Sequence, residues 1–147
     1  MPSFSRRLLW PAALLMLRTA WGAEPPLAIQ GYDPVAYFAV QHATPGVTQF
    51  AYDWDEHRWQ FSSAQHRDLF KADPVRYAPQ FTNFCAVALS RGETHVANPE
   101  YWLISDGKLY LFGKAIGPAL FRKDLKANIE RANHNRALLP KNPANNL

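Results

Sequence analysis

Polar and apolar residues alternate along two stretches of the chain, and a short polar turn interrupts each of them. The stretch 49–61 carries aromatic side chains at alternate positions on either side of the polar residues 55–57: Phe50, Tyr52, Trp54, Trp59 and Phe61. The stretch 101–112 alternates on either side of Asp106–Gly107, a dipeptide typical of two-residue hairpin turns. A period of two residues indicates a strand with one buried face. The sequence therefore predicts two β-hairpins, the first with an aromatic face.

Short helices are predicted where a capping residue precedes an apolar run. Asp33 is a favoured N-cap and Pro34 suits the first helical position, so a helical turn should follow them. Ser62 and Ser63 offer an N-cap for a helix over residues 64–72. The apolar residues that these two helices are expected to direct to the core are Val35, Ala36, Phe38, Leu69 and Phe70.

Two further helical segments are predicted in the second half of the chain. Asp73 and Pro74 start a helical turn that runs through Tyr77. From Pro118 to Leu139 the apolar residues then recur at the spacing of an amphipathic helix: Leu120, Phe121, Leu125, Ile129, Ala132 and Leu139. The elements together predict an α+β fold, a small single domain with two β-hairpins, short helices and a C-terminal amphipathic helix around an aromatic core.

The first residues predict export. Arg6 and Arg7 precede an apolar run over residues 8–17, and small residues at positions 20, 22 and 23 offer a cleavage site. The run is too short to span a bilayer, so we expect no membrane span once the signal is removed; an uncleaved anchor is the alternative. We expect a signal peptide over residues 1–23, a domain over residues 24–139 and a flexible tail over residues 140–147. The location is then periplasmic, reached by a Sec or twin-arginine signal.

Charge and cysteine content narrow the function. The chain has 147 residues and a formal charge of +4, and cleavage after Ala23 removes three arginines and no acid, which leaves +1. The mature part shows no basic patch interleaved with aromatics, so nucleic acid is excluded as a partner. Cys85 is the only cysteine, so no internal disulfide holds the exported domain together.

Few strong chemical motifs are present. The sequence contains no CxxC, HExxH, GxSxG or glycine-rich phosphate loop, and its five histidines form no pair at helical ligand spacing. Both methionines, Met1 and Met16, lie in the predicted signal, which excludes a methionine-rich copper(I) site. No catalytic residue is assigned.

Four segments carry a resemblance to a known family: "IQGYDPVAYF", "WQFSSAQHRDLFKADPVRYAPQF", "FCAVALSRG" and "DGKLYLF". In this order they resemble the YHS-domain family, in particular its exported, single-domain branch, over residues 29–138. The resemblance implies an association with heavy-metal handling. Metal-associated members carry cysteines in a DPVC and an FCSxxC motif, and these positions fall here on Ala36, Ser62 and His66. Only His66 among them can bind a metal ion.

The exported branch carries a Gly-Gly-Tyr-Cys-Ala segment, which matches residues 82–86 here. Cys85 and Ala86 are kept, Phe84 keeps the aromatic, and both glycines are replaced. We expect Asn83 to preserve a left-handed backbone conformation, since asparagine tolerates it best, and the β-branched Thr82 not to.

Three hypotheses for the single cysteine follow. In the first, an exported, non-catalytic binding module holds a small ligand in a pocket formed by Tyr32, Asp33, Phe84 and Cys85, or a copper or zinc ion through Cys85 and His66. In the second, Cys85 is the nucleophile of a thiol enzyme or redox protein, which requires an activated thiolate and a nearby base. In the third, Cys85 is only a buried packing residue of a structural domain.

Overall fold

The computed structural model of the chain describes residues 22–140, so residues 1–21 of the predicted signal peptide and residues 141–147 of the predicted tail lie outside it. The elements, in chain order, are the 3-10 helix η1 (Ala28–Gly31), α1 (Ala36–Ala39), β1 (Val47–Trp54), β2 (His57–Phe61), α2 (Ala64–Ala72), α3 (Pro74–Tyr77), α4 (Ala86–Ser90), β3 (Asn98–Ser105), β4 (Lys108–Phe112), α5 (Gly117–Arg122) and α6 (Leu125–Leu138). The predicted α+β class is confirmed. No helix within residues 22–140 has the length and apolar character needed to cross a membrane.

Both predicted hairpins form, each as an antiparallel two-stranded sheet. β1 pairs with β2 in a register that ends at Trp54 and His57, and β3 pairs with β4 up to Ser105 and Lys108. The second turn has φ values of 49° at Asp106 and 69° at Gly107, and positive values at both central positions are the mark of a type I′ turn. The same backbone twist occurs at the tip of the first hairpin, over residues 55–56.

Aromatic side chains of the first hairpin pack around one residue of α2. Phe70 is fully buried, and the rings of Tyr52, Trp54, Trp59 and Phe61 lie with their centroids 5.0–6.4 Å from its own. Leu69 was expected beside it but is 40% exposed. The reason is geometric: successive helical residues are rotated by about 100°, and α2 packs on the hairpin through the narrow stripe that contains Phe70.

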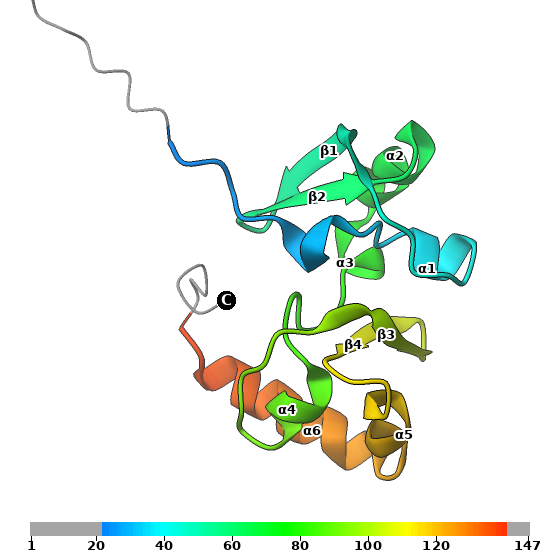
Figure 1. Cartoon of the computed structure of the whole chain (residues 1–147). Helices are drawn as coiled ribbons and strands as arrows, with labels where there is room; N and C mark the ends of the chain where they lie inside the picture. The colour runs from blue at the N-terminus through cyan, green and yellow to red at the C-terminus, as the bar shows by residue number, and fades with distance from the viewer. Residues whose placement is uncertain (1–21, 141–147) are drawn as a thin grey trace, which may run out of the picture.

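The second hairpin lies between two hydrophobic clusters, which replace the single core that the sequence predicted. Leu109 and Leu111 belong to the cluster of the first hairpin, whereas Tyr110 and Phe112 belong to a second cluster with α4, α5 and α6. Alternation along β4 places these pairs on opposite faces of the sheet. Figure 1 shows the β3–β4 hairpin between the upper part, with β1, β2 and α2, and the lower part, with α4, α5 and α6.

The predicted C-terminal helix is two helices. α5 ends at Arg122 and α6 begins at Leu125, with Asp124 between them in a non-helical conformation (φ −147°, ψ 64°). The side-chain amide of Asn128 donates a hydrogen bond of 2.9 Å to the Phe121 carbonyl, which the interruption leaves without a helical partner. The break lets α5 pack its Phe121 against Phe112, while α6 runs along α4 (Figure 1).

Candidate functional site

Cys85 is held by a short ribbon of two segments that are ten residues apart in the sequence. The Cys85 amide donates to the His95 carbonyl at 2.8 Å, and Phe84 and Val96 form an antiparallel bridge. The Ala97 amide donates to the Asn83 carbonyl at 2.7 Å. The Cys85 carbonyl then accepts from Leu89 and so begins α4. The thiol therefore lies at the junction of a fixed ribbon and a helix start.

A Schellman motif ends α4 and brings the chain back to this ribbon. Gly92 has a φ of 79°, its amide donates to the Leu89 carbonyl, and the Glu93 amide donates to the Ala88 carbonyl. This is the hydrogen-bond pattern of a helix end with glycine in the left-handed conformation. The reversal places Arg91, Glu93 and His95 on the same side as Cys85.

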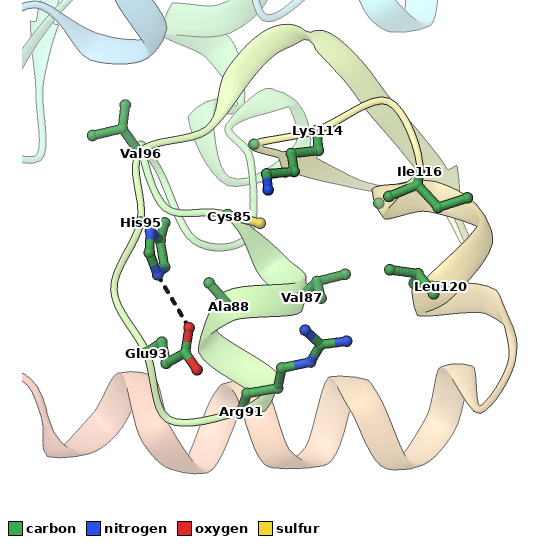
Figure 2. Close-up of a pocket in the computed structure, with 12 residues that line it drawn as sticks. Cys85, Val87, Ala88, Arg91, Glu93, His95, Val96, Lys114, Ile116 and Leu120 are labelled. Carbon is green, nitrogen blue, oxygen red and sulfur yellow. Dashed lines mark hydrogen bonds and ion pairs between the residues drawn. The ribbon is translucent and has the colours of Figure 1, made fainter.

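A cavity of about 340 Å³ lies in front of the thiol. One wall comes from α4 and the returning loop, namely Cys85, Val87, Ala88, Arg91, Glu93, His95 and Val96. The other comes from the segment after β4, namely Gly113, Lys114, Ile116, Gly117 and Leu120. Figure 2 shows the Cys85 sulfur facing this space, with Lys114 on one side and Arg91 on the other. The volume falls at the lower end of the range for small-molecule sites.

The thiol is shielded but not sealed. Cys85 is 8% exposed, is not in a disulfide, and belongs to the second hydrophobic cluster. A methyl group on Gly113 would lie 3.9 Å from the Cys85 sulfur and 3.2 Å from the Val96 carbonyl oxygen. A side chain at position 113 would therefore cover the sulfur, and the glycine keeps it open to the cavity.

Some charged groups of the cavity lining form ion pairs and others do not. His95 Nε2 lies 3.1 Å from the Glu93 carboxylate, and both side chains are well exposed, so the pair adds little to stability. Within residues 22–140, no carboxylate forms an ion pair with Arg91 or Lys114. The cavity therefore carries a net positive charge.

Three of the four residues predicted to form the ligand pocket lie elsewhere. Phe84 is buried in the second cluster, where the Arg136 guanidinium stacks 5.4 Å from its ring centroid. Tyr32 donates a hydrogen bond of 2.8 Å to Glu100, and this bond raises the pKa of the phenol. Of the four residues, only Cys85 lines the cavity.

Asp33 instead organises a separate polar cluster. Its fully buried carboxylate accepts from the amides of Val35 and Ala36 through Oδ1, at 2.9 and 3.2 Å, as an N-cap does. Oδ2 accepts from the Ser62 amide at 2.9 Å, from the Ser62 hydroxyl at 2.6 Å and from His66 Nδ1 at 2.6 Å. One carboxylate thus caps a helix and ties it to the start of α2.

The arrangement of these three side chains is not that of a hydrolase triad. A carboxylate only accepts hydrogen bonds, so the proton of the His66 ring lies on Nδ1. Ser62 approaches the same nitrogen, at 3.3 Å, and its hydroxyl donates to Asp33. A catalytic serine would face the other ring nitrogen, Nε2. The geometry therefore favours a structural tie.

Cys85 and His66, the two predicted metal ligands, are not brought together. His66 lies on α2 in the upper part of Figure 1, and Cys85 immediately precedes α4 in the lower part. The histidine in the Cys85 cavity is His95, which sequence reasoning did not select. The sequence feature that could have identified His95 is its position ten residues after Cys85, on the far side of a short helix that is followed by Gly92. Among the described residues no group of three or more His, Cys, Asp or Glu side chains is placed to hold a metal ion.

The loop before Cys85 reverses the expectation for its backbone. Thr82 has a φ of 50°, in the left-handed region, whereas Asn83 does not have a positive φ. The Asn83 side chain has another task, since its Oδ1 accepts from the Ile29 amide at 2.6 Å. The prediction for these two residues was therefore wrong. The left-handed conformation falls on Thr82, for which it is sterically disfavoured, and Asn83 holds the segment around Ile29 by a side-chain hydrogen bond.

No protein-family model, no curated protein and no solved structure matches this chain.

Proposed function

We propose that the chain is an exported, non-catalytic binding module of the YHS type, which takes a small molecule into the Cys85 cavity. The observation that carries this proposal is the cavity itself. It is bordered by apolar side chains, a shielded thiol and a few charged groups, the usual combination for a small-ligand site.

The polar cluster supports the YHS resemblance. Metal-associated members carry cysteines at positions 36, 62 and 66. Here the backbone amide of Ala36 and the side chains of Ser62 and His66 all contact the Asp33 carboxylate. Residues that are 26 to 30 positions apart thus meet at one point, as a shared site in the family requires. In this chain a methyl group, a hydroxyl and an imidazole stand where those members carry thiols, and the last two donate hydrogen bonds to the Asp33 carboxylate.

Binding is favoured over thiol catalysis because the Cys85 thiol has no hydrogen-bonded base among the described residues. A cysteine nucleophile needs a base within hydrogen-bond reach. Within residues 22–140 the Cys85 thiol forms no hydrogen bond to a base, and His95, the histidine of the cavity lining, has a well-exposed side chain that pairs with Glu93. The thiol therefore serves the site better as a soft contact surface than as a nucleophile.

A copper or zinc ion is the second candidate, because Cys85 and His95 line the same cavity and supply soft and borderline ligands. Metal analysis of the purified exported protein separates the two candidates. Small-molecule binding predicts no stoichiometric metal in the wild type. One equivalent of copper or zinc that is lost in both Cys85→Ala and His95→Ala, but kept in the exposed control His42→Ala, would assign the ion instead.

The small-molecule proposal is tested with 1-octanol, a neutral apolar probe, by NMR titration. We expect shifts confined to α4 and residues 113–120, and their loss in Val87→Phe, which fills the cavity from its centre (Figure 2). The urea midpoint of Val87→Phe serves as the folding control. If neither octanol nor its carboxylate analogue shifts these amides, small-molecule binding at this cavity is refuted.

A further inference from the structure

We infer that the Cys85 cavity selects a small organic anion, a carboxylate with an apolar body. This inference rests on the proposed function and specifies the chemical class of the ligand. It comes from two features of the lining, an apolar wall that reaches the mouth and two cationic groups without a carboxylate partner.

The apolar wall extends further toward solvent than packing requires. Val96 and Ile116 are 48% and 57% exposed, although both border the cavity. Val87 and Leu120 continue the same surface inward and are partly buried. Apolar side chains that remain open around a cavity gain free energy when a ligand covers them, about 25 cal/mol for each Å² of apolar surface. A ligand with a hydrocarbon body would cover this apolar surface.

The two cations approach from opposite walls. Arg91 is the C-cap residue of α4, where the Schellman turn fixes its backbone, and Lys114 follows β4. Figure 2 shows both side chains extending beside the space in front of the Cys85 sulfur. The only acid in the lining, Glu93, is paired with His95. A carboxylate head group would supply the missing anionic partner, and the guanidinium fork of Arg91 matches its two oxygens.

Cys85 contributes surface rather than a bond to this ligand. Its sulfur lies beside Gly113, whose missing side chain leaves it uncovered, so the thiol is available to contact a ligand in the cavity. Sulfur is polarizable and packs well against hydrocarbon. The hydrocarbon body of the ligand therefore lies against Cys85 and the apolar wall, and its anionic head reaches Arg91 or Lys114 on either side.

Three probes of equal chain length test the selection: octanoate, 1-octanol and octylammonium. Calorimetric or NMR titration of the purified exported protein should give octanoate an affinity about tenfold above that of octanol, the scale of one charge-assisted hydrogen bond. Octylammonium should bind most weakly of the three. Added salt should weaken octanoate binding and leave octanol binding unchanged.

Matched variants locate the effect. Arg91→Gln and Lys114→Gln should each lower octanoate affinity about five- to tenfold and leave octanol affinity unchanged. Lys126→Gln, which removes an exposed cation of α6 outside the cavity, is the control and should change neither. Equal affinities for octanoate and octanol would overturn the anion inference and leave small-molecule binding standing. Loss of binding for all three probes would refute the proposed function instead.

Discussion

Replacing Asp33 by asparagine should destabilise the domain more than any other single exchange of one oxygen for an NH₂ group. The Asp33 carboxylate is fully buried and accepts hydrogen bonds from five donors. Asparagine has the same shape but offers one acceptor oxygen and one donor nitrogen. In either orientation of the asparagine amide, its NH₂ group therefore faces backbone N–H groups that also need an acceptor.

The cost depends on which donors can adapt. If the amide nitrogen takes the place of Oδ2, the Ser62 hydroxyl can rotate and the His66 ring can exchange tautomers, but the Ser62 amide cannot move its hydrogen. One buried donor is then unsatisfied, which costs about 1–3 kcal/mol. The opposite orientation leaves the amides of Val35 and Ala36 facing the nitrogen and is worse. With the loss of charge-assisted bonds included, we expect about 2–4 kcal/mol.

Urea denaturation with a matched control measures this value. Asp53→Asn is the control, because the Asp53 carboxylate makes a bidentate contact with Arg58 at an exposed site. The hydrogen bond from Arg58 lowers the pKa of Asp53, yet a surface pair of this kind is worth at most about 1 kcal/mol. If Asp33→Asn loses no more free energy of unfolding than Asp53→Asn, with equal urea slopes, the carboxylate is not the tie described here.

Four further predictions concern single positions. Gly107→Val should cost about 1 kcal/mol or more, because Gly107 has a φ of 69° while its side-chain position is open; an unchanged urea midpoint would contradict the strain. Gly117→Ala should cost about 1–3 kcal/mol, since its methyl would lie 2.5 Å from the Phe112 Cβ, and a thermal melt without change would show that the helix shifts freely. Cys85→Ala should cost about 1 kcal/mol and Cys85→Ser more, and a thiol reagent should label the native protein slowly and the unfolded protein at once; equally fast labelling of both would refute the shielded thiol. Mass spectrometry of the protein from an exporting host should find cleavage near Ala20 to Ala23, and an intact N-terminus in the soluble fraction would refute the signal peptide.

Local signals in the sequence were sufficient for most elements. The alternation around Asp106–Gly107 fixes a hairpin because a turn and its two strands are neighbours in the chain. Ser63 caps α2 by accepting from the His66 amide, and Asp73 caps α3 by accepting from the Arg76 amide, as their spacing predicts. These interactions span three residues and need no knowledge of the tertiary fold.

The site was harder to predict because its parts meet only in the tertiary structure. Cys85 lines the cavity, and its neighbours there come from α4, from the loop after α4 and from the segment after β4. No periodicity links Lys114 to Cys85. Asp33 and His66 were selected individually, and their mutual contact, 33 residues apart, was not foreseen. Sequence patterns thus singled out Cys85, Asp33 and His66 individually but did not predict which residues lie together in the folded protein.

The position of the β3–β4 hairpin between the two hydrophobic clusters has a consequence for cooperativity. Leu111 faces the cluster of the first hairpin and Phe112 faces the cluster of α4, α5 and α6. If the part of the fold around either cluster opened, one face of the same two strands would be exposed to solvent. Exposing fully buried leucine and phenylalanine side chains costs about 1.5–3 kcal/mol for each. The two halves should therefore unfold as one unit, and the amide hydrogens of β3 and β4 should exchange with solvent only through global opening, later than those of β1.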